Sequence, residues 1–354
     1  MNNKIFKTFS VAVFLIMYLT AEAQEKQFGV TTISVVQHRE MPDFSAELGN
    51  QILCGTVVKI TDSQGYWKKV KSPEPYSAWC VDLAIKEMDA GELEEYMQLP
   101  KVICTAAHSN IMSGPSSKAQ KICDIVQGNI LILEERLSGK YVKVSLADGR
   151  TGYILRKDVE NFRKWANGTT ASAENIIETA LGYLGIPYVW GGTSVNGMDC
   201  SGLTRMVWFM NGALLPRNAS QQALAGNKVE VSSDTRRFPV ENSANLCQEE
   251  GFRDEMLRRI ENLKPGDLIF FGRPADNGGK DRISHVGIYL GEGKFIHASR
   301  YVRINSLIPG SENWYEGAGK FISARRVTEE EGMQDIPRIS ESYDYFRATE
   351  WISE

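Results

Sequence analysis

The stretch GMDCSGLTRMVWFMNG, residues 197–212, places a lone cysteine, Cys200, between an aspartate and a Ser-Gly pair, directly ahead of an apolar run. Asp199 stands where a helix N-cap is expected, so Cys200 is predicted to begin a helix. The partial positive charge of a helix N-terminus favours the thiolate form of a cysteine. The stretch is therefore compatible with a nucleophile, and equally with an ordinary buried small residue.

The overall composition indicates a globular protein of several domains. The chain has 354 residues, of which 42% are hydrophobic and 24% are charged, and its formal net charge is −4. This length is enough for two or three domains. The mildly acidic balance gives no reason to expect nucleic acid as a partner.

The N-terminus has the pattern of an export signal. Residues 1–23 carry two early lysines, then the apolar run Val11–Leu19, then the small-residue site Ala21-Glu22-Ala23. This order is typical of a cleaved signal peptide, and the apolar run is too short to span a bilayer. We therefore expect an exported protein, periplasmic or extracellular, with no membrane association after cleavage.

Export permits disulfides, and the number of cysteines, six, is even. They show no CxxC or comparable metal-binding spacing, and their pairing cannot be deduced from the sequence. We interpret the four that precede Cys200 as buried thiols. The six cysteines are Cys54, Cys80, Cys104, Cys123, Cys200 and Cys247.

Residues 26–85 and 100–160 contain similar series of short β-like runs, broken by Gly, Pro, Asp and Ser. Each series has a Gly-led strand followed by a strand that begins with an aromatic residue, Trp67 in the first and Tyr141 in the second. The similarity predicts an internal duplication of one small all-β barrel. We place the two barrels at residues 24–88 and 99–162.

Residues 165–330 have a different pattern, with helices first and strands after. A helix is predicted within 171–185, and the Cys200 helix follows a Gly-rich loop. Later come a strand at 268–271 and two strands joined by a turn at Glu292-Gly293. This order predicts an α+β domain with an antiparallel sheet. The acidic and aromatic residues 331–354 form a C-terminal extension to which we assign no role.

Two of the four histidines, His285 and His297, fall on the two strands joined by that turn. A thiol peptidase needs a cysteine with a depressed pKa, an imidazole in reach and a third group that orients the imidazole. Cys200, His285 and His297 supply these in order. A histidine on a strand is, however, more often structural, and the same three residues also suit a catalytic zinc ion. The remaining His38 and His108 lie in loop-like stretches and have no assigned role.

Six motifs follow one another along the C-terminal half of the chain. They are PYVWGG (187–192), DCSG (199–202), PRNASQ (216–221), LKPGDLIFF (263–271), SHVGIY (284–289) and FIHAS (295–299). With these motifs the chain resembles the NlpC-type cell-wall cysteine peptidases, whose catalytic domain has a reduced papain-like α+β fold, and its N-terminal units resemble bacterial Src-homology-3-like domains. The resemblance implies that Cys200 is the nucleophile and disfavours zinc.

For the chemistry, the resemblance implies a peptidase without a cofactor or metal. Cys200 would attack the carbonyl carbon, His285 would act as base and then as acid, and His297 would orient His285. The Cys200 amide and the Tyr188 hydroxyl are the expected oxyanion donors. Trp190 is expected to form a wall of the site.

For the substrate, the resemblance implies peptidoglycan stem peptides, cut between γ-D-glutamate and the following diamino acid. In relatives with two such barrels, the first barrel recognises the free amine of an N-terminal L-alanine, and Glu47 and Tyr76 stand at the matching positions. Glu47 is otherwise an exposed loop carboxylate. Further substrate contacts are expected from Asp199, Ser201 and Ser220. We expect a monomer.

Two other functions stay open at this point. The protein can be an autolysin that acts on intact peptidoglycan, or a peptidoglycan-binding protein whose catalytic domain is incidental. A requirement for a free N-terminal L-alanine separates recycling of released peptides from autolysis.

Overall fold

The computed structural model describes residues 26–135, 139–232, 251–274 and 281–346. The expected signal peptide and Cys247 lie outside these residues. The five other cysteines are free thiols. No helix in the described ranges is long and apolar enough to cross a membrane.

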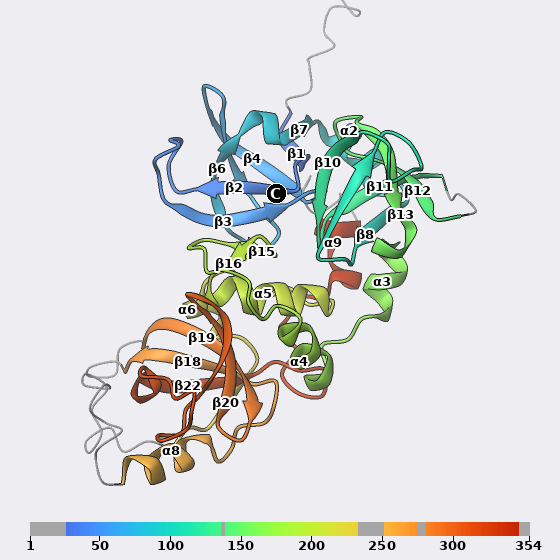
Figure 1. Ribbon diagram of the computed structural model, residues 1–354. Coiled ribbons are helices and arrows are strands. Elements are labelled where there is room, and N and C mark those ends of the chain that lie inside the picture. The colour runs from blue at the N-terminus through green and yellow to red at the C-terminus, as the bar shows by residue number, and fades with distance from the viewer. Residues whose placement is uncertain (1–25, 136–138, 233–250, 275–280, 347–354) are drawn as a thin grey trace, which may run out of the picture.

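The N-terminal half consists of two seven-stranded antiparallel sheets (Figure 1). The first contains β1 (Phe28–Thr31), β2 (Val35–Arg39), β3 (Leu48–Leu53), β4 (Val57–Gln64), β5 (Trp67–Lys71), β6 (Ser77–Val81) and β7 (Ile85–Met88). The second contains β8 (Lys101–Cys104), β9 (His108–Met112), β10 (Lys121–Val126), β11 (Ile130–Glu135), β12 (Tyr141–Ser145), β13 (Thr151–Leu155) and β14 (Val159–Asn161).

The two sheets confirm the predicted duplication. The first sheet has the strand order β3-β2-β6-β5-β4-β1-β7, and the second has the order β10-β9-β13-β12-β11-β8-β14. Adding seven to each strand number of the first sheet gives the order of the second. The equivalent glycines Gly55 and Gly128 both have left-handed backbone, at φ 82° and 86°. Such φ values favour glycine, which explains why a glycine introduces the fourth strand of each unit.

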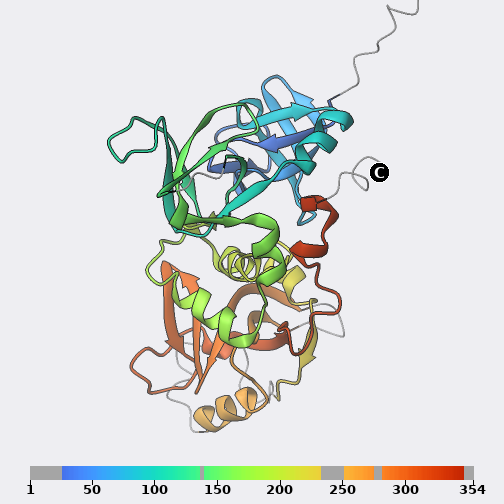
Figure 2. The same cartoon turned by 90° about the vertical axis from the view of Figure 1, so that its right-hand side faces the viewer.

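A short helix, α2 (Ala90–Gln98), connects the two sheets. Asp89 caps it, and the side chain of Glu92 accepts a hydrogen bond from the Asp89 backbone N–H in return, which completes a capping box. Leu93, Tyr96 and Met97 are buried against the first sheet unit. The two sheets lie together above the rest of the molecule (Figure 2).

The C-terminal half is a mixed α and β domain, as predicted. Its helices are α3 (Phe162–Gly168), α4 (Ala173–Leu181), α5 (Cys200–Met210), α6 (Ala219–Gln222) and α8 (Phe252–Ile260). A two-stranded sheet joins β15 (Thr193–Ser194) to β16 (Gly197–Met198). The main sheet has the order β17-β22-β18-β19-β20-β21, with β17 (Asn227–Val229), β18 (Leu268–Arg273), β19 (Arg282–Gly291), β20 (Lys294–Ser299), β21 (Tyr301–Ser306) and β22 (Phe321–Arg326).

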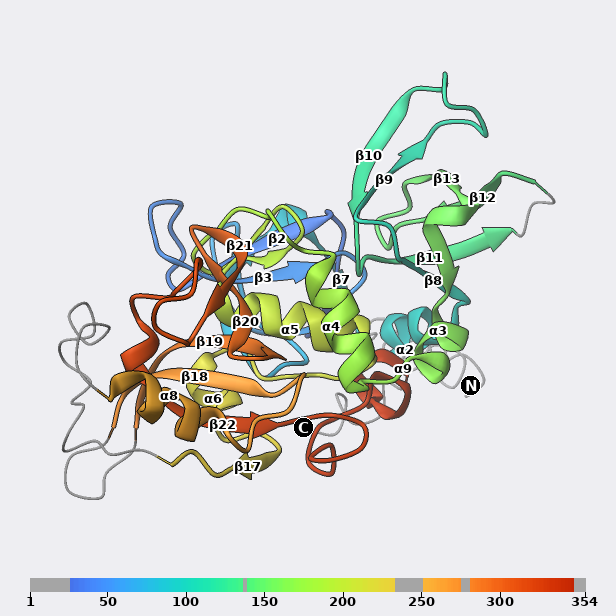
Figure 3. The ribbon, with the colours of Figure 1, turned by 60° about the horizontal axis from the view of Figure 1, so that its bottom comes forward.

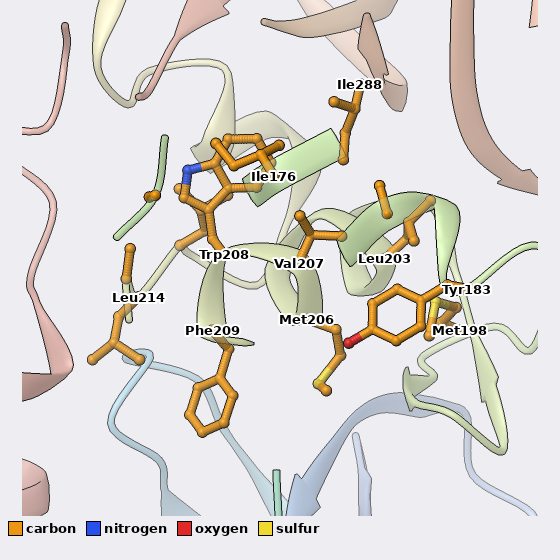
Figure 4. Packing of buried hydrophobic residues seen from close by; sticks show 14 of the residues in the cluster. Ile176, Tyr183, Met198, Leu203, Met206, Val207, Trp208, Phe209, Leu214 and Ile288 are labelled. Atoms are coloured by element: carbon orange, nitrogen blue, oxygen red, sulfur yellow. The ribbon is translucent and has the colours of Figure 1, made fainter. Parts of the chain in front are cut away.

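Helix α5 forms the centre of the largest hydrophobic core. Its residues from Cys200 to Phe209 are all buried, as expected for a helix that is enclosed on every side. Figure 4 shows Met206 and Phe209 on one side of the helix and Val207 and Trp208 on the other. The Trp208 indole N–H donates to the Val327 carbonyl at 2.8 Å, so this buried polar atom has a partner.

The described part of the C-terminal extension packs onto this domain. The Leu214 amide donates to the Pro337 carbonyl, and the Ile339 amide donates to the Gly212 carbonyl, each at 2.9 Å. Beyond the short turn η6 (Ile339–Glu341), helix α9 (Tyr343–Phe346) places Phe346 in a stack on Phe162. Four side chains of this segment therefore belong to the largest hydrophobic core, namely Met333, Ile336, Ile339 and Tyr345.

Two sets of buried polar contacts join the first sheet to the loop and helix around Cys200. The Gln51 amide oxygen accepts from the Thr193 amide at 3.0 Å and from the Ser194 hydroxyl at 2.9 Å. The Arg205 guanidinium, on α5, pairs with the buried Glu74 carboxylate. In Figure 1, β3 lies directly above β15, β16 and α5.

Replacing Glu74 with glutamine should strongly destabilise the protein. The variant leaves the Arg205 charge buried without its partner, which typically costs about 3–5 kcal/mol. The matched control is Glu230→Gln, because the Glu230–Lys228 pair is exposed on both sides and such pairs contribute at most about 1 kcal/mol. The measurement is thermal and urea unfolding of both variants. If the two variants unfold at the same midpoint, the Glu74–Arg205 pair does not stabilise the protein as expected.

Candidate active site

Cys200 is the first residue of α5, and Asp199 is the N-cap of that helix, as predicted. Asp199 Oδ1 accepts from the Gly202 amide at 2.7 Å, and Oδ2 accepts from the Gly191 amide at 3.0 Å. The same carboxylate pairs with the buried Arg217 guanidinium at 2.5 Å. Asp199 thus anchors both the helix and the preceding loop.

Ser201 belongs to the same network. Its hydroxyl accepts from Arg217 at 2.9 Å and donates to Asp199 Oδ1 at 3.3 Å. Asp199 and Ser201 are both buried, so the structure gives them a part in holding the N-terminus of α5. Their predicted contacts with substrate stay predictions.

The expected depressed pKa of Cys200 is wrong for the unliganded site. Burial, together with the charge of the neighbouring Asp199 carboxylate, raises the pKa of its thiol to about 11. The backbone N–H groups of Val286 and Ser201 point at the sulfur and lower the pKa, but they do not offset the loss of water. The Val286 contact places the sulfur beside the backbone of β19, at the residue that follows His285 in the chain.

His285, on β19, and His297, on β20, form a direct hydrogen bond. His285 Nε2 and His297 Nδ1 are 2.6 Å apart, and the two rings meet edge to face. Gly287 leaves the necessary space, because a Cβ atom there would lie 3.3 Å from His297 Cβ and 2.8 Å from the Phe295 ring. The predicted juxtaposition of the two histidines is therefore present.

Asn305, on β21, determines which ring nitrogens carry protons. Its Nδ2 donates to the Asn313 carbonyl at 2.9 Å, so its Oδ1 faces His297 Nε2, also at 2.9 Å. An amide oxygen can only accept, so His297 Nε2 carries the proton and Nδ1 is an acceptor. His285 Nε2 must then donate to His297, which leaves His285 Nδ1 unprotonated. That nitrogen is the one available to act as a base.

This arrangement also bears on the zinc alternative. Both ring nitrogens of His297 are engaged, one with His285 and the other with Asn305. His297 therefore has no lone pair left for a metal ion while these bonds exist. Within the described ranges, no group of three or more His, Cys, Asp or Glu side chains is arranged to hold a metal.

Both histidines are neutral at rest. Burial, with a smaller contribution from the Arg303 charge, lowers the pKa of His285 to about 3 and that of His297 to about 4. The raised thiol pKa and the lowered imidazole pKa together describe a neutral pair. The proton would therefore pass from sulfur to His285 only as the sulfur attacks.

Two aromatic side chains border this group. Burial and the nearby Cys200 raise the pKa of Tyr188 to about 12, so its hydroxyl keeps the proton that the predicted oxyanion role requires. Tyr315 meets the His297 ring edge to face at 5.0 Å and shields the histidine pair from water. The sequence analysis missed Tyr315, which lies in a loop beyond β21.

The predicted substrate residues of the first sheet lie beside the Cys200 loop. Glu47 is exposed and accepts a hydrogen bond from the Trp190 indole N–H at 2.6 Å. The Tyr76 hydroxyl donates to Glu40. Burial, this hydrogen bond and the charges of Glu40 and Glu47 raise the pKa of Tyr76. Glu40 is thus a second carboxylate at this edge, which the sequence analysis missed. Ser220, by contrast, is exposed on α6.

His38 was expected in a loop, but it lies within β2 and is fully buried. Its Nε2 donates to the Val70 carbonyl at 3.1 Å, and burial lowers its pKa to about 4. His108 begins β9, where its ring pairs with Asn196 at 3.1 Å.

The buried histidines should make the protein less stable in acid. Below pH 6.5 the histidines of the unfolded chain bind protons, whereas a buried histidine of the folded protein stays neutral. Stability should therefore fall as the pH drops from 6.5 toward 4. Replacing His38 with glutamine should reduce this dependence by up to about 1.4 kcal/mol per pH unit. Urea unfolding from pH 4.5 to 7.5 measures it, with His108→Gln as the exposed control. An unchanged slope in the His38 variant would refute the assignment.

Comparison with known proteins agrees with this geometry. Residues 185–323 match the model of the NlpC/P60 family. The chain is 27% identical over 288 residues to a gamma-D-glutamyl-L-lysine dipeptidyl-peptidase of Bacillus cereus, an alignment that covers 78% of this chain and 76% of the relative. It is 28% identical to dipeptidyl-peptidase 6 of Lysinibacillus sphaericus, over 75% of this chain and 86% of the relative.

Solved structures show the same fold. An NlpC/P60 family protein from Bacillus cereus superposes with a TM-score of 0.65 at 23% identity, over 84% of this chain and 99% of its own. An NlpC/P60 endopeptidase from Photobacterium damselae subsp. piscicida superposes with a TM-score of 0.54 at 16% identity, over 80% of this chain and 67% of its own. Behind its two all-β domains, this chain therefore carries a peptidase domain of the NlpC/P60 family.

Proposed function

We propose that the protein is a cysteine endopeptidase that cuts peptidoglycan-derived peptides between γ-D-glutamate and a diamino acid, and that it requires a free N-terminal L-alanine. The observation that carries the proposal is the hydrogen-bonded series Asn305–His297–His285, next to Cys200 at a helix N-terminus. The printed names of relatives that align over most of the chain support the choice of bond. The predicted signal peptide would place the enzyme outside the cytoplasm.

In the proposed reaction, the Cys200 sulfur attacks the γ-carbonyl carbon while its proton moves to His285 Nδ1. The developing oxyanion accepts hydrogen bonds from the Cys200 amide and the Tyr188 hydroxyl. His285 then donates the proton to the leaving amine, and an acyl-enzyme remains on the sulfur. Water, deprotonated by the same histidine, releases the acyl group.

The His297–Asn305 pair serves this proton transfer in two ways. It keeps His285 in the tautomer whose Nδ1 is free, and it accepts the Nε2–H of His285 when that ring becomes charged. The second effect matters because the site is buried, so water cannot stabilise the imidazolium. His297 and Asn305 are positioning residues in this scheme.

On the acyl side, we propose that Glu47 pairs with the free α-amine of the substrate. Its carboxylate lies at the Trp190 edge of the site, within the electrostatic reach of Tyr76. Glu40 holds the Tyr76 hydroxyl and adds a second negative charge. Two carboxylates at one edge of the site favour an ammonium group over a neutral amide.

Replacing Asn305 with alanine should lower kcat by about 10- to 100-fold with little change in KM, because general-base catalysis of this kind contributes about 10²- to 10⁴-fold and only its tautomer control is lost. The assay is hydrolysis of the L-Ala-γ-D-Glu-diamino acid tripeptide, and the Cys200→Ala variant gives the background rate. In a His297→Ala background the same change should add little, since the two residues act as a unit. Additive losses would show that Asn305 acts only on packing.

Replacing Glu47 with glutamine should lower kcat/KM for the free tripeptide by at least about 30-fold, while the bond to Trp190 is kept. N-acetylation of the substrate should harm the wild type comparably and the variant much less. Mass spectrometry of the products measures both. Equal cleavage of free and acetylated tripeptides by the wild type would remove the amine requirement and favour the autolysin function.

A further inference from the structure

A pocket of about 500 Å³ opens beside the histidine pair, on the side of β21. Asn305 and Tyr315, which both touch His297, form part of its lining. Arg303 also lines it and lies directly opposite His297 in the register of β20 and β21. The pocket is therefore continuous with the catalytic group, although none of the motifs singled out in the sequence accounts for it.

The lining of the pocket is strongly basic. It contains three cationic side chains, Arg300, Arg303 and Lys320, and a single carboxylate, Glu316. None of these three cations forms an ion pair with another described residue, whereas the buried Arg205, Arg217 and Arg326 each have a carboxylate partner. The positive charge of the pocket is thus left uncompensated.

Two residues of the lining also carry hydrogen-bond donors that lack acceptors. The Arg303 Nε and the Trp314 indole nitrogen are both buried, and neither has a partner among the described residues. A buried donor without an acceptor costs about 1–3 kcal/mol, so such groups usually mark a place for a ligand or a water molecule. Both atoms are donors, which calls for an acceptor and, given the charges, an anionic one.

Arg300 adds a sign of backbone strain at the edge of the pocket. It forms the tip of the β20–β21 hairpin with φ 64°, a left-handed conformation that favours glycine or asparagine. Strain of this kind is often kept where a side chain is needed at a functional site. Here it presents a guanidinium at the edge of the pocket.

The position of the pocket relates it to one half of the substrate. In the proposed reaction the acyl group is bonded to Cys200 and runs toward Glu47 at the Trp190 edge. His285 must protonate the leaving amine, so the leaving group lies over the histidine pair. The basic pocket borders the same pair through Asn305 and Tyr315, which both contact His297.

We propose that this basic pocket, defined by Arg300, Arg303 and Lys320, binds a carboxylate of the diamino-acid leaving group. The inference rests on the proposed function and extends it to the other side of the cut bond. A guanidinium binds a carboxylate through two parallel hydrogen bonds, and a nearby ammonium adds charge. The carboxylate has two sources, the α-carboxylate of any C-terminal diamino acid and the side-chain carboxylate of diaminopimelate, which lysine lacks.

Three tripeptides distinguish these sources. All begin with L-Ala-γ-D-Glu and end in lysinamide, lysine or diaminopimelate, which carry zero, one and two leaving-group carboxylates. The wild type should cut the lysine peptide at least about 10-fold better than the lysinamide peptide, given that a charged hydrogen bond contributes about 1.5–3 kcal/mol. A further gain with diaminopimelate would assign the side-chain carboxylate to the pocket, and no gain would assign the α-carboxylate.

The variant Arg303→Gln tests the pocket itself. It should remove the preference for the carboxylate-bearing peptides, so that the variant cuts all three peptides at rates within about threefold of one another. The Arg303 charge also lowers the pKa of both histidines, so its loss can change the rate on every substrate. The comparison therefore uses only the ratios of cleavage rates between substrates within one variant. Lys294→Gln, which removes an exposed cation at the other end of β20, is the control and should keep the wild-type ratios. Equal losses on all three peptides, or equal cleavage of all three by the wild type, would overturn the proposal.

A binding measurement separates this proposal from the proposed function. Free diaminopimelate and lysine are titrated into the Cys200→Ala protein by calorimetry, with and without Arg303→Gln. Binding that Arg303→Gln weakens about 10-fold or more supports the pocket even if no tripeptide is cut. If neither amino acid binds and the three tripeptides are cut equally well, the proposed carboxylate pocket is refuted.

Discussion

The hydrogen bond between His285 and His297 is the contact on which the candidate site depends. At 2.6 Å it requires β19 and β20 to hold both rings on one face of the sheet, and it requires Gly287 to leave that face open. Asn305 gives the bond its direction, because only an acceptor faces the far nitrogen of His297. Figure 3 shows the strands β18 to β21 that hold this group beside α5. The position and tautomer of His285 thus depend on the sheet as much as on the residue itself.

Burial gives the site its resting state. The thiol and both imidazoles are neutral because each would lose its hydration if it became charged alone. In the proposed reaction, a proton that moves from Cys200 to His285 would create both charges together, and the oxyanion donors and His297 would then stabilise them. Asp199 and Arg217 keep their own charges paired and hold the N-terminus of α5 in place.

The first sheet unit is part of the site. Gln51 binds the loop that precedes Cys200, and Gly191 in that loop lies so close to the Leu48 carbonyl that a Cβ atom would come within 2.1 Å of it. This contact brings Glu47 to Trp190. The Arg205–Glu74 pair fastens the same unit to α5 itself. The edge of the first sheet that carries Glu47 and the helix that begins at Cys200 are therefore held in a fixed relation by buried polar contacts.

The sequence by itself determined the local features: the Asp199 cap, the helix that begins at Cys200, the two histidine strands and the duplicated sheets. Each follows from a short-range pattern of caps, turns and alternation. Only the tertiary structure decided what those residues do to one another. Asn305, Glu40 and Tyr315 could not be assigned because their partners lie on other elements, and the pairs Arg205–Glu74 and Thr193–Gln51 join residues 131 and 142 positions apart. The thiol pKa failed as a prediction for the same reason. A helix N-terminus is visible in the sequence, whereas the burial that outweighs it exists only once the sheet, the loop and α5 have packed together.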